Sequence, residues 1–475
     1  MTARFDLLRL PILSGFLRWR YSRFVLQMPL FLLALLAVYD GFTGRQLAPA
    51  NTATVAVWVH YRGLVALALA VLGNLFCAAC PLMLTRGSSK FLKRFVPQFE
   101  FRFGNKYPVL GLILLFLFSY EYFDLWASPW ITAWLILAYF VAALLVDTFF
   151  SVGTFCKYVC PLGNFNFALS VASPTQITAR DQNICATCEG KYCLNGRLET
   201  TTTRAPLLGN RAEHVLLQLA PLPHKALGTF PGCETNLFVP SIQSNQDCTL
   251  CLNCLRACPY DNVALAVRNP VQEAIQTRPK SDWAWLMVFL TWAGLLNAFA
   301  MIPPYYAVAH WLSRLLGTRA EALLLGIIFS VILVCGLGLT TLAARASRGT
   351  IRDWVGVLYP LTIAIWGGHY LFHFMTGAST LLPNIITALM RLGVPLEPPA
   401  LPATVRTDGI FLFQVGLSYL ALLASFYIAY RKAVQHNPQM ILRQMLPQVL
   451  LALLINTVTI LIFSQPMQAR GSLLP

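Results

Sequence analysis

Charged side chains are scarce in this sequence. Asp, Glu, Lys and Arg together make up 11% of its 475 residues, whereas hydrophobic residues make up 57%. Soluble globular domains carry about 25% charged residues, so the composition excludes an ordinary soluble protein. Acidic residues are the scarcer sign, with 19 Asp and Glu against 35 Lys and Arg. The composition is that of a chain that lies largely inside a membrane.

Long apolar runs take the place of the missing charge. A run of about 20 apolar residues is long enough to cross a bilayer as one helix. We therefore predict an all-α polytopic membrane protein with about nine transmembrane helices, at residues 24–40, 55–76, 108–126, 130–150, 283–303, 319–343, 354–375, 409–430 and 444–464. A polar interval at 151–282 interrupts them. We expect a four-helix membrane domain at 1–150, a polar domain at 151–282 and a five-helix membrane domain at 283–475.

The basic residues predict how the chain is oriented. Lys and Arg in short loops stay on the cytoplasmic side, and here they cluster before the first expected helix, after the second, and in the loops near 345–352 and 431–443. The N-terminus and the 151–282 domain are then cytoplasmic and the C-terminus is periplasmic, in a bacterial inner membrane. Because contact with lipid and the orientation account for the net charge of +16, we expect no nucleic-acid partner.

Cysteine is concentrated in the polar interval. The stretch "CTLCLNCLRACP" contains Cys248, Cys251, Cys254 and Cys258 in the spacing C-x2-C-x2-C-x3-C-P. Bacterial ferredoxins use this run for [4Fe–4S] clusters, and its fourth cysteine binds the other cluster of a pair. The run therefore predicts a second set of thiols.

The remaining cysteines of the interval supply that second set. "CATCEGKYC" contains Cys185, Cys188 and Cys193, and "PGCETN" contains Cys233. In the two-cluster scheme the first three are completed by Cys258, and Cys233 completes the set at 248–254. Cys193 is separated from Cys188 by four residues, whereas the corresponding cysteines of the ferredoxin run are separated by two.

Zinc or disulfide bonds are the alternatives for these eight thiols. A reducing cytoplasm disfavours disulfides, and structural zinc takes four donors, typically as two C-x2-C pairs. Thiolates are soft donors suited to iron, and backbone N–H groups directed at sulfur tune the potential. We therefore predict two [4Fe–4S] clusters in an inserted ferredoxin-like α+β domain.

Two further cysteine pairs stand at expected helix ends. "FCAACPLM" contains Cys77 and Cys80, and "FCKYVCPLGNFN" contains Cys156 and Cys160. With these motifs ahead of the ferredoxin-like run, residues 20–280 resemble the NapH/NosR-type membrane polyferredoxins, whose helix ends carry C-x3-C-P motifs. Cys77 and Cys80 depart from that pattern, because two residues separate them instead of three. These four thiols are expected to form an additional cluster or metal site or a redox-active dithiol pair; packing of small residues at helix ends is the alternative.

Histidines mark a possible intramembrane site. "WGGHYLFHF" places His369 and His373 one turn apart on one helix face, and His60 starts the second expected helix at a similar depth. Ionisable groups are costly inside a membrane and indicate function by default. We expect a haem, quinol or metal site here, and a haem would need His60 or another helix's histidine opposite one of the pair. Hydrogen bonding between helices, or a place at the membrane interface beside Tyr370, is the alternative.

What the resemblance implies is electron transfer in a membrane respiratory chain, with no substrate chemistry at the clusters. We predict a membrane-bound iron–sulfur protein that links a cytoplasmic electron donor or the quinone pool to a respiratory redox partner. The alternative is a metal-handling assembly factor, for example a copper-reducing one, for a respiratory enzyme. The outer loops carry no Met-rich or His-rich stretch, which favours electron transfer.

Overall fold

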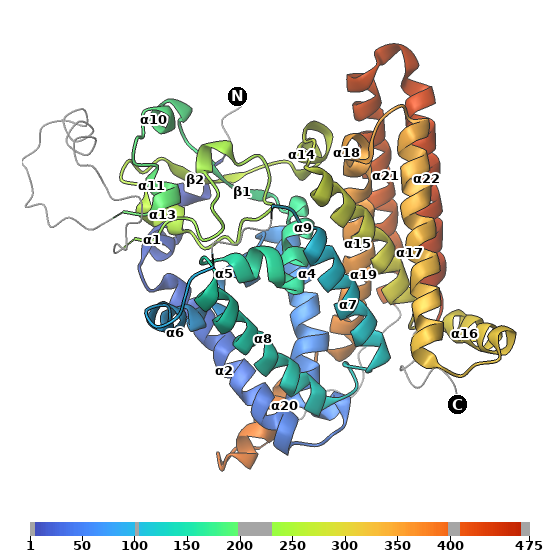
Figure 1. Cartoon of the computed structure of the whole chain (residues 1–475), viewed down its shortest axis with the longest axis horizontal. Helices are drawn as coiled ribbons and strands as arrows, with labels where there is room; N and C mark the ends of the chain where they lie inside the picture. The colour runs from blue at the N-terminus through green and yellow to red at the C-terminus, as the bar shows by residue number, and fades with distance from the viewer. Residues whose placement is uncertain (1–4, 100–103, 198–229, 398–408, 467–475) are drawn as a thin grey trace, which may run out of the picture.

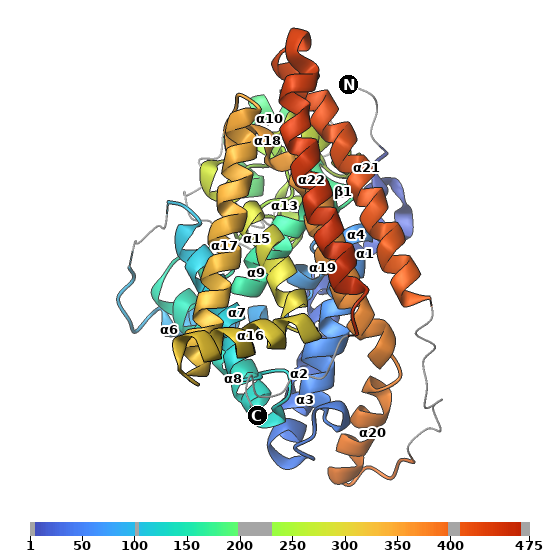
Figure 2. The same cartoon turned by 90° about the vertical axis from the view of Figure 1, so that its right-hand side faces the viewer.

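The computed structural model describes residues 5–99, 104–197, 230–397 and 409–466 of the chain. It shows a mostly helical protein in which long helices stand beside one another and a small domain with two strands lies across one end of the N-terminal helices (Figures 1 and 2). Helices therefore dominate, as the long apolar runs predicted.

The regular elements described in the N-terminal part, up to the polar domain, are helices joined by short loops, and Asp6 forms an isolated β-bridge with Ala266. Its main elements are α1 (Pro11–Arg18), α2 (Ser22–Thr43), α3 (Thr52–Thr54), the π-helix η3 (Val55–Tyr61), α4 (Arg62–Val71), α5 (Leu75–Ala78), η4 (Pro81–Thr85), α6 (Arg86–Leu92), α7 (Tyr107–Tyr122) and α8 (Pro129–Phe149). Elements α3, η3 and α4 together form one span, Thr52–Val71.

The polar domain contains the strands of the described chain. Its elements are the π-helix η5 (Phe155–Val159), α9 (Pro161–Leu169), β1 (Thr175–Ala179), α10 (Gln182–Ala186), α11 (Tyr192–Asn195), α13 (Asn253–Ala257), β2 (Val263–Val267) and α14 (Pro270–Gln276). The two strands pair antiparallel, with Thr175 opposite Val267 and Ala179 opposite Val263.

The C-terminal part is again helical. Its main elements are α15 (Ser281–Phe299), α16 (Pro303–Leu316), α17 (Glu321–Ala346), α18 (Ile351–Trp354), η8 (Val355–Leu358), α19 (Tyr359–Gly377), α20 (Leu381–Arg391), α21 (Ile410–His436) and α22 (Ile441–Phe463). Helix α15 lies at the centre of the largest apolar core, and Leu286, Met287, Val288 and Leu290 on it are fully buried.

Seven helical spans in the described chain are long and apolar enough to cross a membrane. They are Ser22–Thr43, Thr52–Val71, Pro129–Phe149, Glu321–Ala346, Ile351–Gly377, Ile410–His436 and Pro438–Phe463. The other two expected segments form α7, with 16 residues, and α15, which bends by 89° into α16 and makes an eighth span if the bent pair is counted as one. A polytopic helical architecture is thus supported, and the expected count of nine is not confirmed.

The basic helix ends lie on the side of the polar domain. The Nζ of Lys106, just before α7, is 2.7 Å from Oδ1 of Asp247, and Nε of Arg352 on α18 donates to the carbonyl of Pro279 at 2.8 Å. At the opposite end, Arg391 of α20 pairs with Asp40 of α2 at 2.5 Å. Lys106 and Arg352, two of the basic residues that the orientation rule uses, therefore lie beside the polar domain, and the orientation of the chain in a membrane stays a prediction.

A close contact between α15 and α17 yields a test of the packing. Gly336 of α17 lies against the ring of Trp292, where an added Cβ would overlap ring atoms, whereas nothing lies within 4 Å of a Cβ at Gly338 on the same helix. Overpacking of this kind costs about 1–3 kcal/mol. We expect Gly336→Ala to lower the unfolding temperature of the purified protein in detergent and Gly338→Ala to leave it unchanged or slightly raised. Equal temperatures for the two variants would contradict this packing.

Candidate functional site

The two-stranded sheet brings the two ferredoxin-like segments together. Strand β1 leads into the segment with Cys185, and β2 follows directly after Cys258, so antiparallel pairing places these cysteines at the same end of the sheet. Apolar side chains from both strands, among them Ile177 and Leu265, form one small core with Cys193. The sheet therefore fixes the relative positions of segments about seventy positions apart in sequence.

We call Cys185, Cys188, Cys193 and Cys258 the upstream set. All four thiols line one small pocket in the polar domain. Burial, with a smaller contribution from the neighbouring thiols of the other three, raises the pKa of Cys193 to about 12. The grouping of Cys258 with the upstream cysteines is the one that the two-cluster scheme predicted.

We call Cys233, Cys248, Cys251 and Cys254 the downstream set. Burial raises the pKa of Cys254, and the thiols of the other three add to that increase. Burial also raises the pKa of Cys248 to about 12, with Cys251 and Cys233 as neighbours. The structure therefore places Cys233 beside the 248–254 loop, as predicted.

The helix-end cysteines Cys77, Cys80, Cys156 and Cys160 also come together. Burial raises the pKa of Cys160, and the nearby thiols of Cys80 and Cys77 add to it. Burial raises that of Cys156 too, and Cys160 and Cys80 are among its neighbours. The two pairs, which come from different helix ends, thus form one group of four.

Each Cys-Pro step of the helix-end group places a thiol at the start of a helix. Cys160 is the N-cap of α9 with Pro161 at its first turn, and its Sγ accepts a hydrogen bond from the N–H of Gly163 at 3.2 Å. Cys80 is likewise the N-cap of η4, followed by Pro81. Proline suits the first helical position because its missing N–H would be unpaired there. A helix N-terminus favours a thiolate, because its N–H groups point at the sulfur.

The three groups are adjacent in a fixed order. Cys193 of the upstream set is a neighbour of Cys254 of the downstream set. Cys77 of the helix-end group is in turn a neighbour of Cys248, whose backbone carbonyl accepts a hydrogen bond from the Asn74 side chain at 2.8 Å. The order runs from the polar domain to the helix ends.

The cysteine loops have an unusual backbone. Eight non-glycine residues of the described chain have positive φ, and all but two of them lie within three positions of a cysteine of the upstream or downstream set: Lys191, Asn236, Asp247, Leu250, Leu252 and Asp261. Left-handed residues alternating with ordinary ones turn successive N–H groups to one side, and such concave arrangements bind anions and iron–sulfur clusters. A bulky residue adopts this conformation only where the surroundings enforce it.

Backbone N–H groups accordingly point at thiols in all three groups. The N–H of Leu237 is 3.2 Å from Sγ of Cys233, and that of Asn262 is 3.4 Å from Sγ of Cys258. Leu250 donates to Cys248 in the same way. A neutral thiol is a weak acceptor, so these donors suit sulfur that carries negative charge.

The donor sets can be compared with the metal groups considered above. Zinc needs its donors around one ion. Across the described residues no group of three or more His, Cys, Asp or Glu side chains is placed to hold a single metal ion, in the three cysteine groups or elsewhere. A [4Fe–4S] cluster takes four thiols, each at a different iron, so its donors are spread around it. The number of thiols, their order along the chain and the N–H donors fit such a cluster in the upstream and downstream sets.

A buried ion-pair network joins the polar domain to the membrane helices. Glu234, next to Cys233, contacts both Arg23 of α2 and Arg86 of α6, and Arg86 also pairs with Asp147 of α8 at 3.1 Å. Burial alone would raise the pKa of Glu234, but the two guanidinium charges outweigh burial and lower it. This carboxylate was not among the predicted site residues, although its place beside a cysteine in an acid-poor chain was a usable signal.

The three histidines lie near one another in the fold without forming one ligand group. The rings of His369 and His373 are 5.0 Å apart and nearly perpendicular. Both ring nitrogens of His60 face backbone carbonyls, of Val55 at 3.2 Å and Ala378 at 3.3 Å. A haem, quinol or metal at these histidines therefore stays a prediction.

Comparison with known proteins adds no identification. No protein-family model, curated protein or solved structure matches the chain. The resemblance to the NapH/NosR-type polyferredoxins therefore depends on the cysteine motifs alone and stays a prediction.

The Glu234 network yields a test with a matched control. Glu234→Ala leaves Arg23 and Arg86 buried without their shared partner, and breaking a buried pair costs about 3–5 kcal/mol. Asp261 also pairs with two arginines, Arg18 and Arg180, but its side chain is 58% exposed. Asp261→Asn removes this charge and keeps a residue that tolerates the positive φ at this position, so it is expected to cost at most about 1 kcal/mol. Denaturant unfolding of the two purified variants measures the difference. Equal losses of stability would show that Glu234 does not hold the domain in place.

Proposed function

We propose that this protein transfers electrons between its polar domain and the membrane, and that the upstream and downstream sets each hold one [4Fe–4S] cluster. Such clusters supply one-electron transfer. The helix-end group is an additional redox or metal site next to the membrane. The electron donor is a cytoplasmic protein or the quinone pool, and the acceptor is a respiratory redox partner.

The order of the three thiol groups carries this proposal. A single metal site for structure would need one group of four cysteines, whereas here twelve cysteines form three adjacent groups that lead from the polar domain to the helix ends. Adjacent redox sites are what stepwise electron transfer needs. A purely structural role leaves this order unexplained.

The orientation in the proposal has separate support. The polar domain carries buried thiols that must stay reduced until their metal is inserted, which a cytoplasmic location provides. The loops at 345–352 and 431–443 are basic and meet on that side, where His436 contacts the carbonyl of Arg348 at 3.1 Å. The proposed location is a bacterial inner membrane with the N-terminus and polar domain cytoplasmic and the C-terminus periplasmic.

One contact favours a second candidate function. The Sγ of Cys156 lies 3.5 Å from the thioether sulfur of Met83. Thiolate and thioether are the soft donors that select Cu(I). A copper-handling assembly factor would use this helix-end group to bind its metal, and metal analysis separates the two functions.

The clusters are tested by metal content. Two [4Fe–4S] clusters give about eight iron and eight acid-labile sulfide per chain, measured on protein purified without oxygen, with electron paramagnetic resonance after reduction. Cys254→Ser removes a downstream ligand and is expected to lower iron by about half. Cys335→Ser is the matched control, because Cys335 is exposed on α17, and it should leave iron unchanged. Stoichiometric zinc without a cluster signal would refute the proposal, and copper at the helix-end group would favour the second candidate.

The orientation is tested with reporter fusions. A reporter fused after residue 475 should behave as periplasmic, and one inserted near residue 200 should behave as cytoplasmic, because the basic loops stay inside. Alkaline phosphatase and green fluorescent protein activities measure the two sides. The reverse pattern would place the cluster domain outside and exclude a cytoplasmic donor.

A further inference from the structure

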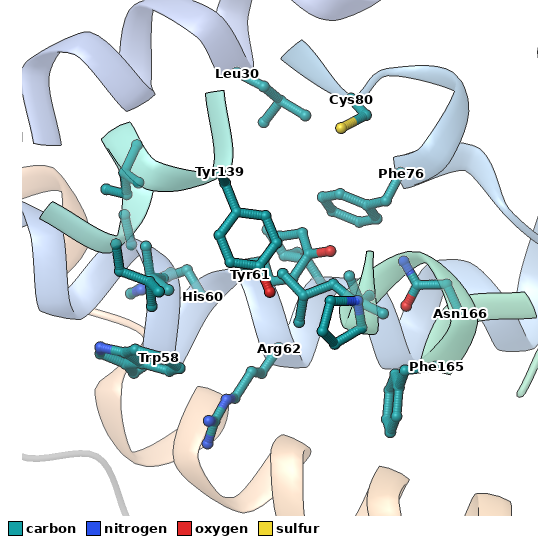
Figure 3. Close-up of a pocket in the computed structure, with 18 of the residues that line it drawn as sticks. Leu30, Trp58, His60, Tyr61, Arg62, Phe76, Cys80, Tyr139, Phe165 and Asn166 are labelled. Atoms are coloured by element: carbon teal, nitrogen blue, oxygen red, sulfur yellow. The ribbon is translucent and has the colours of Figure 1, made fainter. Parts of the chain in front are cut away.

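A large apolar cavity opens between the helices on the membrane side of the helix-end group. Its volume is about 270 Å³, and its walls come from α2, η3, α4, α5, η4, α7, α8, α9, α15, α19 and α20. Figure 3 shows Tyr139 reaching from α8 among the side chains that line it. Most of the other lining residues are aliphatic or aromatic, so the cavity suits an apolar ligand.

The side chain of Tyr139 lines this cavity and carries a hydroxyl without a hydrogen-bond partner among the described residues. The hydroxyl of Tyr139 is buried, and no residue of the described chain forms a hydrogen bond with it. An unpaired buried hydroxyl costs about 1–3 kcal/mol. A ligand that accepts a hydrogen bond from Tyr139 would remove this cost.

A second phenol lies on the wall of the same cavity. The Tyr61 hydroxyl bonds the side chain of Asn166, which in turn lies 3.7 Å from Sγ of Cys77. Tyr61, Asn166 and Phe76 are all among the lining residues labelled in Figure 3. Cys80 itself forms part of the wall. A ligand in the cavity would therefore lie beside the helix-end cysteines.

The backbone on this wall is irregular. Tyr61 ends the π-helix η3, Val55–Tyr61, and six of the seven residues from 56 to 62 line the cavity. π-Helical turns are rare and occur frequently at functional sites. The irregular helical turn therefore forms part of the cavity wall, where it would contact a bound ligand.

We propose that this cavity binds the ring of a membrane quinone, with Tyr139 donating a hydrogen bond to a ring carbonyl. The cavity accepts a flat apolar ring and an apolar tail, and its free polar group is a donor that matches a neutral carbonyl oxygen. The choice of a redox-active quinone over another apolar carbonyl compound rests on the proposed function. The cavity and the unpaired Tyr139 hydroxyl are observed independently of the proposed function.

Two other occupants fit the lining less well. An anionic ligand would need the guanidinium of Arg62, but that group already lies over the rings of Trp58, Tyr120 and Tyr370 and donates to the Tyr120 hydroxyl at 3.0 Å. A haem would need an imidazole nitrogen, and both nitrogens of His60 face carbonyls. A neutral carbonyl ligand uses neither residue.

The test measures binding of tritiated decylubiquinone to the full chain in phospholipid nanodiscs, so that any bound quinone has displaced lipid. Tyr139→Phe keeps the ring and removes the donor, and is expected to weaken binding about three- to tenfold. Ala34→Phe fills the cavity from α2 and is expected to abolish binding. Tyr122→Phe is the matched control, because Tyr122 lies outside the cavity lining on α7, and it should bind like the unmodified chain.

A competitor separates recognition of the ring carbonyls from simple partitioning into an apolar space. Decylbenzene has the same tail and a ring without carbonyls, so it should compete poorly. Equal competition by decylbenzene, or unchanged binding in either Tyr139→Phe or Ala34→Phe, would overturn the proposal. Quinone binding can be measured whether or not the protein contains iron. If the purified protein binds quinone but contains no iron or sulfide, the proposed electron-transfer function is refuted and the quinone site is not. If the protein contains both clusters but does not bind quinone, the quinone site is refuted and the proposed function is not.

Discussion

The contact of Glu234 with two arginines is the interaction on which the arrangement of the thiol groups depends. It is the buried ion pair that connects the segment of Cys233 to both α2 and α6. A buried carboxylate is tolerated only when opposite charge and hydrogen bonds replace water, so its position is narrowly determined. Because Glu234 directly follows a downstream cysteine, this constraint also sets how far that set lies from the helix ends.

Buried thiols impose the second constraint. Burial raises the pKa of cysteines in all three groups, because an ionised thiol is poorly solvated there. In the proposed function, a metal centre would supply the positive charge that makes buried thiolates stable. The left-handed residues of the cysteine loops and their inward N–H groups serve the same charge balance, and they hold the backbone in a shape that the chain would not adopt by preference.

Much of this arrangement was predictable from the chain. The spacing of the 248–258 run predicted that Cys258 would lie with Cys185 and not with the other cysteines of the run. The structure places Cys258 and Cys185 in one pocket. All nine expected apolar segments are helical, but α7 is shorter than a span and α15 bends into α16. Hydropathy reports how apolar a segment is; where its helix ends or bends depends on packing with neighbours, which no local pattern contains.

The sequence by itself determined the apolar helices and which cysteines of the polar domain belong together, because hydropathy and spacing act over a few residues at a time. The side of the membrane on which the basic loops lie stays a prediction. For Cys77, Cys80, Cys156 and Cys160 the sequence left two alternatives, a common site or packing at separate helix ends, and only the tertiary structure shows that the four lie together. It alone also shows that Tyr139 lines a cavity beside them. These residues come from different helices, and their distances follow from how side chains pack across the whole fold. That packing depends on many weak contacts between remote segments, which the order of residues along the chain does not reveal.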